Sequence, residues 1–242
     1  MKILRNYFKG WNWFELSVLI AAFIVPPVVG IIVGSSILEI LAPMFGMMVA
    51  ILYAKAKFEA FPLTFVSVGL YVILAWQSGI FSEVIYMLAV LMPLTIYGLI
   101  NWKRNQRKDD AKGQVTVLRG ARGLELLILA IVLAVASVGI YFFLRWFETE
   151  HLIISTASLI TGTAAMYLIT RRFKWALAVH ILYSASVIVL WMLFIVPDNW
   201  NMVVVLLNPI IFITCDIYGT FHWRRLEKRQ AGTQSDPAPP AT

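Results

Sequence analysis

Eight apolar stretches dominate this sequence, each close to the ~20 residues that an α-helix needs to cross a bilayer. Lipid offers no partners for free backbone N–H and C=O groups, and the apolar–polar alternation of a barrel strand is missing. We therefore predict an all-α membrane protein with eight transmembrane helices. The predicted spans are Phe14–Gly34, Ser36–Tyr53, Ala60–Trp76, Glu83–Asn101, Leu124–Leu144, Leu152–Thr170, Trp175–Val196 and Met202–Gly219.

The composition supports a membrane rather than a nucleic-acid partner. Hydrophobic residues make up 60% of the chain and charged residues 14%, whereas a soluble domain has about 25% charged residues. The net charge of +7 comes from short basic clusters between the apolar stretches, not from a basic stripe with interleaved aromatics. The single cysteine, Cys215, predicts neither a disulfide nor a metal cluster.

The basic residues also predict the orientation of the chain. With the N-terminus inside, 19 of the 20 Lys and Arg residues fall in the inner segments, and only Arg145 falls outside. Such an asymmetry is typical of cytoplasmic loops. We expect a multi-pass protein of the cell (cytoplasmic) membrane with both termini in the cytoplasm. The inner segments are 1–13, 54–59, 102–123, 171–174 and 220–242.

Two echoes within the sequence indicate an internal repeat. The pattern I-Y-G-x-x-x-W-[KR]-R ends at Arg104 and recurs 121 positions later, ending at Arg225. A weaker echo, at a spacing of 115, relates Trp76 to Trp191. Aromatic and basic residues at a helix end also serve as interfacial anchors, but the shared I-Y-G exceeds what anchoring requires. We interpret the first echo as a duplication.

The duplication predicts a 3+1+3 arrangement of parallel repeats behind one extra N-terminal helix. The linker helix inverts the direction of the chain, so both triplets run the same way through the membrane, and such repeats place a substrate site near the midplane between them. The expected parts are an amphipathic segment with the extra helix (1–34), a first repeat (36–101), a basic loop with the linker helix (102–148), a second repeat (152–225) and a disordered cytoplasmic tail (226–242). The loop 103–123 looks like a hinge between the halves.

Short motifs along nearly the whole chain resemble the Pnu family of vitamin transporters, of which the PnuC nicotinamide riboside transporters are the best known. They are Tyr7-Phe8-Lys9-Gly10-Trp11 with Phe14-Glu15, Phe81-Ser82-Glu83-Val84, Met92-Pro93, Gly98, Trp102-Lys103-Arg104-Asn105, Ala165-Met166 and Arg171-Arg172-Phe173. The resemblance implies facilitated diffusion with intracellular phosphorylation as the trap, a SWEET-like 3+1+3 core and a homotrimer.

Several positions depart from the family pattern. The W-x-x-W-x-x-x-N motif of the seventh helix falls on Ala176, Val179 and Tyr183, and an expected Asn of the third helix falls on Ser67. Expected Asn, Gln and Trp of the fourth helix fall on Met87, Thr95 and Leu99, and an acidic-Ser motif of the sixth falls near Ser155 and Thr156. The substrate could therefore be nicotinamide riboside or a related vitamin or nucleoside, such as thiamine or riboflavin.

Polar and aromatic residues inside the predicted spans are the candidates for substrate contact. They are Ser67, Tyr71, Thr95, Thr156, Tyr183, Trp191, Asn208 and Asp216. An Asp inside a span usually faces a cavity or a partner, so Asp216 is either a substrate contact or gate residue, or a shallow partner of a cytoplasmic Arg. Ser and Thr also bond their own helix carbonyls, and aromatic side chains also face lipid. Glu39 and Glu83 are expected to be solvated at the outer side.

The sequence offers little support for an enzyme. His151, His180 and His222 show no metal-ligand spacing, and no H-E-x-x-H or G-x-S-x-G motif occurs. We predict no catalytic residue, metal or cofactor, and a small solute and the lipid bilayer as partners. The alternatives are a non-transporting membrane scaffold or sensor, favoured if the polar positions are packed shut or face lipid, and an intramembrane enzyme built on a hidden His/Asp cluster.

Overall fold

The computed structural model describes residues 8, 10–106, 123–195 and 200–234. Within these ranges eight helices are long and apolar enough to cross a membrane, which confirms the predicted all-α, eight-span class. Six are α2 (Trp13–Val33), α3 (Ile37–Ala54), α4 (Ala60–Gln77), α7 (Gly123–Trp146), α8 (Leu152–Thr170) and α9 (Ala176–Ile195). Another joins α5 (Phe81–Ile85), a π-helical segment (Tyr86–Leu91) and α6 (Met92–Arg104), and the last joins a 3-10 segment (Trp200–Leu206) to α10 (Leu207–Gln234).

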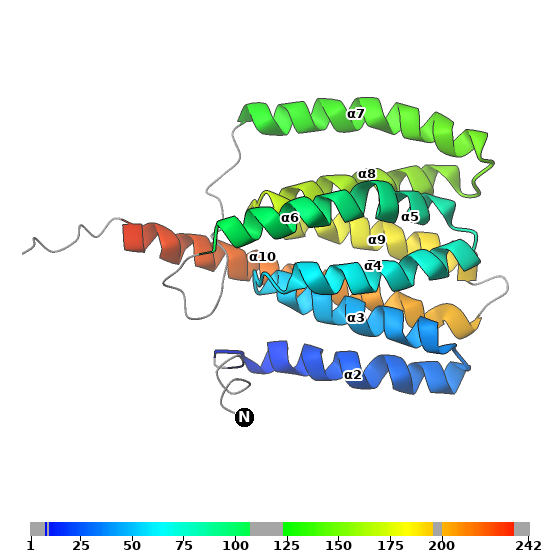
Figure 1. Cartoon of the computed structure of the whole chain (residues 1–242), viewed down its shortest axis with the longest axis horizontal. Helices are drawn as coiled ribbons and strands as arrows, with labels where there is room; N and C mark the ends of the chain where they lie inside the picture. Colours follow the sequence, from blue (N-terminus) through cyan, green and yellow to red (C-terminus); the bar gives the residue numbers. More distant parts are fainter. Residues whose placement is uncertain (1–7, 9, 107–122, 196–199, 235–242) are drawn as a thin grey trace, which may run out of the picture.

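The helices lie side by side in one bundle (Figure 1). Its centre is formed by α3, α4, α6, α8, α9 and α10, while α2 packs against α3 on one side and α7 against α8 on the other. The start of α2 and the end of α10 lie at the same end of the bundle (Figure 1), as an even number of crossings requires.

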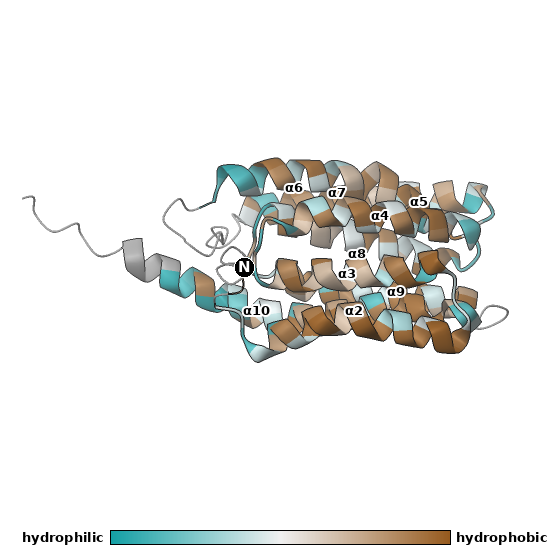
Figure 2. Cartoon of the chain, turned by 60° about the horizontal axis from the view of Figure 1, so that its bottom comes forward, coloured by the Kyte–Doolittle hydropathy of each residue, from teal (hydrophilic) through white to brown (hydrophobic). Residues whose placement is uncertain are grey.

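Hydrophobic residues dominate the helices, and hydrophilic residues gather toward the helix ends (Figure 2). Many large apolar side chains are exposed on the bundle. Helix α7 is the extreme case, since Leu144 is its one buried residue. Exposed Ile, Leu, Val and Phe side chains at this density would be unfavourable in water, and they suit the hydrocarbon of a bilayer. The chain is therefore a multi-pass membrane protein.

The turns α3–α4 and α8–α9 have the same backbone conformation. Ala56 and Arg172 both adopt a left-handed conformation, with φ of 55° and 64°. The next amide bonds back to a helix carbonyl in both turns, from Lys57 to Leu52 at 2.9 Å and from Phe173 to Leu168 at 3.0 Å. These two left-handed residues lie 116 positions apart, one more than the spacing of 115 in the weaker echo.

Two tryptophans connect two sets of three helices, the first made of α3, α4 and α6 and the second of α8, α9 and α10. Both lie at the end of the bundle from which α10 extends. Trp102 of α6 donates from Nε1 to the Ile169 carbonyl of α8 at 3.0 Å. Trp223 of α10 donates from Nε1 to the Tyr53 carbonyl of α3 at 3.1 Å. Both indoles are fully buried, and their ring centroids lie 5.7 Å apart. These residues are therefore core residues and not interfacial anchors.

Two glycines allow the helices beside these tryptophans to approach closely. A Cβ at Gly98 would lie 2.9 Å from Thr170 Cγ2, and a Cβ at Gly219 would lie 2.8 Å from Ala54 Cα. Each glycine thus faces the end of a helix in the opposite set. Small residues are the usual means by which membrane helices come into close contact.

The last helix is longer than the sequence indicates. Helix α10 continues to Gln234, so the predicted disordered tail does not begin at residue 226. Leu226 is buried, and Glu227 Oε2 pairs with Lys174 Nζ at 3.2 Å, so packing and charge hold this extension. Residues 235–242 of the tail, and most of the loop predicted as a hinge, lie outside the described residues.

Gly219→Ala should destabilise the protein, because the new Cβ meets backbone that cannot rotate away. We expect the free energy of unfolding to fall by about 1–3 kcal/mol, the usual cost of overpacking, and to be seen as a lower melting temperature in detergent. Gly139→Ala is the matched control, since a Cβ there meets no atom within 4 Å. Equal melting temperatures for the two variants would contradict the close approach of α10 and α3.

Candidate functional site

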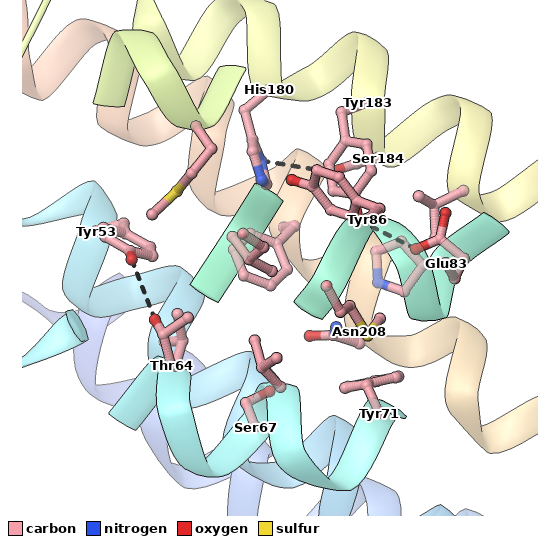
Figure 3. Close-up of a pocket in the computed structure, with 18 of the residues that line it drawn as sticks. Tyr53, Thr64, Ser67, Tyr71, Glu83, Tyr86, His180, Tyr183, Ser184 and Asn208 are labelled. Carbon is pink, nitrogen blue, oxygen red and sulfur yellow. Dashed lines mark hydrogen bonds between the residues drawn. The ribbon is translucent and has the colours of Figure 1, made fainter. Parts of the chain in front are cut away.

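A cavity of about 100 Å³ lies inside the bundle between the two sets of three helices. Its walls come from α3, α4, α5 and the π-helical segment, α8, α9, the 3-10 segment and α10 (Figure 3). Most of its surface is apolar, with a limited number of polar groups, which is typical of small-molecule sites. The polar and tyrosine side chains in its wall are Tyr53, Thr64, Ser67, Tyr71, Glu83, Tyr86, His180, Tyr183, Ser184 and Asn208.

The helix that carries the π-helical segment brings Glu83 and Tyr86 into this cavity. Pro93 has no N–H to donate to the preceding turn, and the irregular segment ends just before it. A π-helical turn shifts the side chains that follow it and often marks a functional position. Here Tyr86, Met87 and Leu91 of this segment line the cavity.

Glu83 is fully buried in the cavity wall. Its Oε1 accepts a hydrogen bond from Ser158 Oγ at 3.1 Å, and its Oε2 accepts one from the Tyr183 hydroxyl at 3.4 Å. The expectation of a solvated Glu83 is therefore wrong. The turn at Gly79, with φ of 73°, and the buried Ile80 direct this end of the helix into the bundle.

Two tyrosine rings form an aromatic wall next to Glu83. The centroids of Tyr86 and Tyr183 lie 5.2 Å apart, and a Cβ at Gly162 would lie 2.7 Å from Tyr86 and 2.8 Å from Tyr183. Glycine at position 162 therefore gives both rings the room they occupy. Trp191 adds a further buried aromatic side chain, so the cavity could hold a planar ring by stacking.

Tyr71 and Asn208 approach each other at another part of the wall (Figure 3). Within the described residues, the Tyr71 hydroxyl and Asn208 Oδ1 make no hydrogen bond of standard geometry. Buried polar atoms normally have partners, so these two side chains are candidates for hydrogen bonds to a bound solute. Gly46 of α3 lies against the Asn208 side chain, and because glycine has no Cβ it leaves space for the amide.

A His–Asp pair lies on the α9–α10 side of the cavity. His180 Nδ1 lies 2.7 Å from Asp216 Oδ2 and 3.5 Å from Ser184 Oγ. In a hydrolase triad the carboxylate and the nucleophile contact opposite ring nitrogens, whereas here both contact the same one. The cluster therefore lacks the geometry of a triad. Among the described residues, no group of three or more His, Cys, Asp or Glu residues is placed to hold a metal ion.

The structure brings five of the predicted substrate contacts together at the cavity. Ser67, Tyr71, Tyr183, Trp191 and Asn208 line it.

The other three predicted contacts lie away from the cavity surface. Asp216 stands behind the wall, where it pairs with His180 and not with a cytoplasmic Arg. Thr95 and Thr156 donate at 2.7 and 2.8 Å to the carbonyls of Leu91 and Leu152 in their own helices. This is the structural alternative considered for Ser and Thr in membrane helices.

Six further polar or tyrosine residues at the cavity are not among the predicted contacts. They are Tyr53, Thr64, Glu83, Tyr86, His180 and Ser184. Thr64 Oγ1 lies 3.1 Å from the Tyr53 hydroxyl. Hydropathy alone sets the predicted span boundary, and it puts Glu83 at that boundary. The sequence contains one signal that Glu83 belongs to the cavity. It is an acidic residue at the start of an apolar run, and acidic residues inside membrane spans usually face a cavity or a partner.

Comparison with known proteins gives consistent matches. The model of the family described as "Nicotinamide mononucleotide transporter" matches residues 36–225. The nicotinamide riboside transporter PnuC of Neisseria mucosa is 22% identical over 231 residues, covering 94% of this chain and 87% of the relative. PnuC of Haemophilus influenzae is also 22% identical, covering 94% of this chain and 97% of the relative.

The fold matches a solved structure as well. A crystal structure of the vitamin B3 transporter PnuC superimposes with a TM-score of 0.82 at 20% identity, covering 93% of this chain and 96% of that chain. A membrane bundle that encloses an aromatic and polar cavity fits a transporter. With a family match that spans most of its length, this chain belongs to the nicotinamide mononucleotide transporter family and is a membrane transporter, not an enzyme.

Proposed function

We propose that this protein carries nicotinamide riboside across the membrane by facilitated diffusion, with intracellular phosphorylation trapping the product. The observation that carries the proposal is the central cavity, which combines stacking surfaces from Tyr86, Tyr183 and Trp191 with hydrogen-bonding groups from Tyr71 and Asn208. A pyridine ring and a ribose need those two kinds of contact. The names of the relatives support the same substrate.

Because several positions depart from the family pattern, related substrates are also candidates. Tyr183 stands where the family has Asn, and it lines the cavity. Thiamine, riboflavin and nucleosides also combine a planar ring with polar substituents. A scaffold or sensor role is disfavoured, because five of the predicted polar and aromatic positions line a cavity and are neither packed shut nor in contact with lipid.

The two sets of three helices support the 3+1+3 repeat as part of this proposal. The matched turns at Ala56 and Arg172 and the reciprocal bonds of Trp102 and Trp223 relate the first set to the second. Rocking of the halves about this contact would open the cavity to either side of the membrane in turn. The homotrimer implied by the resemblance stays a prediction.

Purified protein in proteoliposomes should take up radiolabelled nicotinamide riboside with saturation, and only to equal concentrations inside and outside. Enclosing a nicotinamide riboside kinase with ATP should convert this equilibration into accumulation, because phosphorylation removes the transported species. At zero membrane potential, ion gradients should not change the final level. Absence of saturable uptake of nicotinamide riboside, thiamine, riboflavin and nucleosides would reject the proposal.

Asn208→Leu should weaken transport while keeping the side-chain volume. Loss of a buried hydrogen-bonding group costs about 1–3 kcal/mol, so we expect roughly a tenfold or larger drop in kcat/KM for uptake. Thr214→Val on the same helix is the control, since Thr214 is exposed and bonds the Ile210 carbonyl of its own helix. Equal effects of the two substitutions would argue against Asn208 as a substrate contact.

Reporter fusions at the two chain ends should both report a cytoplasmic location. The clustering of 19 of the 20 Lys and Arg residues in segments on one side supports this orientation. Alkaline phosphatase should be inactive, and green fluorescent protein fluorescent, at either end. Opposite results at the two ends would contradict an even number of crossings.

A further inference from the structure

Glu83 is the one carboxylate among the described residues that line the cavity, and no Lys or Arg lines it. The only donors to its oxygens among the described residues are two neutral hydroxyls, those of Ser158 and Tyr183. The neighbouring carboxylate, Asp216, differs because it is paired with His180. Asp216 therefore has an imidazole partner, whereas Glu83 has only hydroxyl partners among the described residues.

Burial makes this arrangement costly without a ligand. A carboxylate removed from water loses several kcal/mol of hydration, and hydroxyl hydrogen bonds replace only part of it. Acidic residues inside membrane spans are usually paired or lie on the path of a substrate or ion. The described chain supplies no cation to Glu83, so a cationic solute is the partner that would stabilise it most.

The surroundings of Glu83 suit a cation attached to a flat ring. Tyr86 and Tyr183 flank it with ring centroids 5.2 Å apart, and both rings line the cavity. Aromatic faces attract cations, and cages of aromatic residues recognise quaternary nitrogen compounds. One anionic group beside two tyrosine rings thus provides both contacts that an aromatic cation needs.

We propose that the cavity selects solutes with a positively charged aromatic ring, and that Glu83 is the charge partner of that ring. The inference rests on the proposed transport function and narrows its substrates. Nicotinamide riboside carries a fixed charge on its pyridinium ring and thiamine carries one on its thiazolium ring, whereas riboflavin and ordinary nucleosides are neutral. Cationic vitamins are thereby favoured over neutral ones.

The test compares two ligands of nearly the same shape. Nicotinamide riboside is cationic, and its 1,4-dihydro form is neutral. Calorimetric binding to the purified full chain should show tighter binding of the cation by the wild type. In Glu83→Gln, the affinity for the cation should fall about 30-fold or more, while the affinity for the neutral form should change little. Glu83→Asp retains the charge and should retain the preference for the cation.

Glu39→Gln serves as the matched control. Glu39 is also a buried carboxylate near the start of a helix, but it bonds the Ser36 amide and lies outside the cavity wall. This variant should behave as wild type toward both ligands, and melting temperatures verify that all variants are folded.

Equal affinity of the wild type for both forms, or an unchanged preference in Glu83→Gln, would overturn the inference while leaving transport intact. Absence of both binding and saturable uptake of every solute tested would instead reject the proposed function, and the inference with it.

Discussion

The reciprocal hydrogen bonds of Trp102 and Trp223 are the interaction on which the arrangement of the bundle depends. Each indole leaves its own set of helices and bonds a backbone carbonyl in the other, at 3.0 and 3.1 Å. In lipid, apolar surface alone gives helices little reason to associate, so close packing and polar bonds must hold them. Two fully buried indoles with satisfied N–H groups, beside the glycine contacts of α6 and α10, supply both.

The same constraint explains how polar groups are distributed inside the membrane. Most find partners within the protein, as Asp216 does with His180 and Tyr53 with Thr64. Glu83, Tyr71 and Asn208 differ: they line the cavity, Glu83 accepts only two hydroxyl hydrogen bonds, and the Tyr71 hydroxyl and Asn208 Oδ1 make no hydrogen bond of standard geometry within the described residues. A transporter needs such groups, since a solute leaving water must find replacements for its lost hydration.

Hydropathy failed where a polar residue belongs to the interior. Hydropathy predicts Glu83 as the solvated beginning of a span, yet the turn at Gly79 brings it into the cavity wall. Trp76 and Trp191 looked equivalent, but Trp76 is 64% exposed and Trp191 is 2% exposed. Thr95 and Thr156 are polar enough to be candidates, but their hydroxyls donate hydrogen bonds to carbonyls of their own helices. In each case the direction of the side chain, and not its chemistry, decides whether it faces the cavity, the lipid or its own helix.

The sequence by itself determined the helical class, the eight spans and most of their boundaries, because backbone groups in lipid have no partners outside a helix and the span length is set by bilayer thickness. It also identified five cavity residues, since polar and aromatic side chains inside apolar spans are few. Only the tertiary structure decided which of these side chains meet, which are satisfied locally and that Glu83 joins them. Those outcomes depend on the rotation and separation of helices far apart in the chain, which glycines such as Gly46 and Gly162 set through contacts that a linear pattern does not contain.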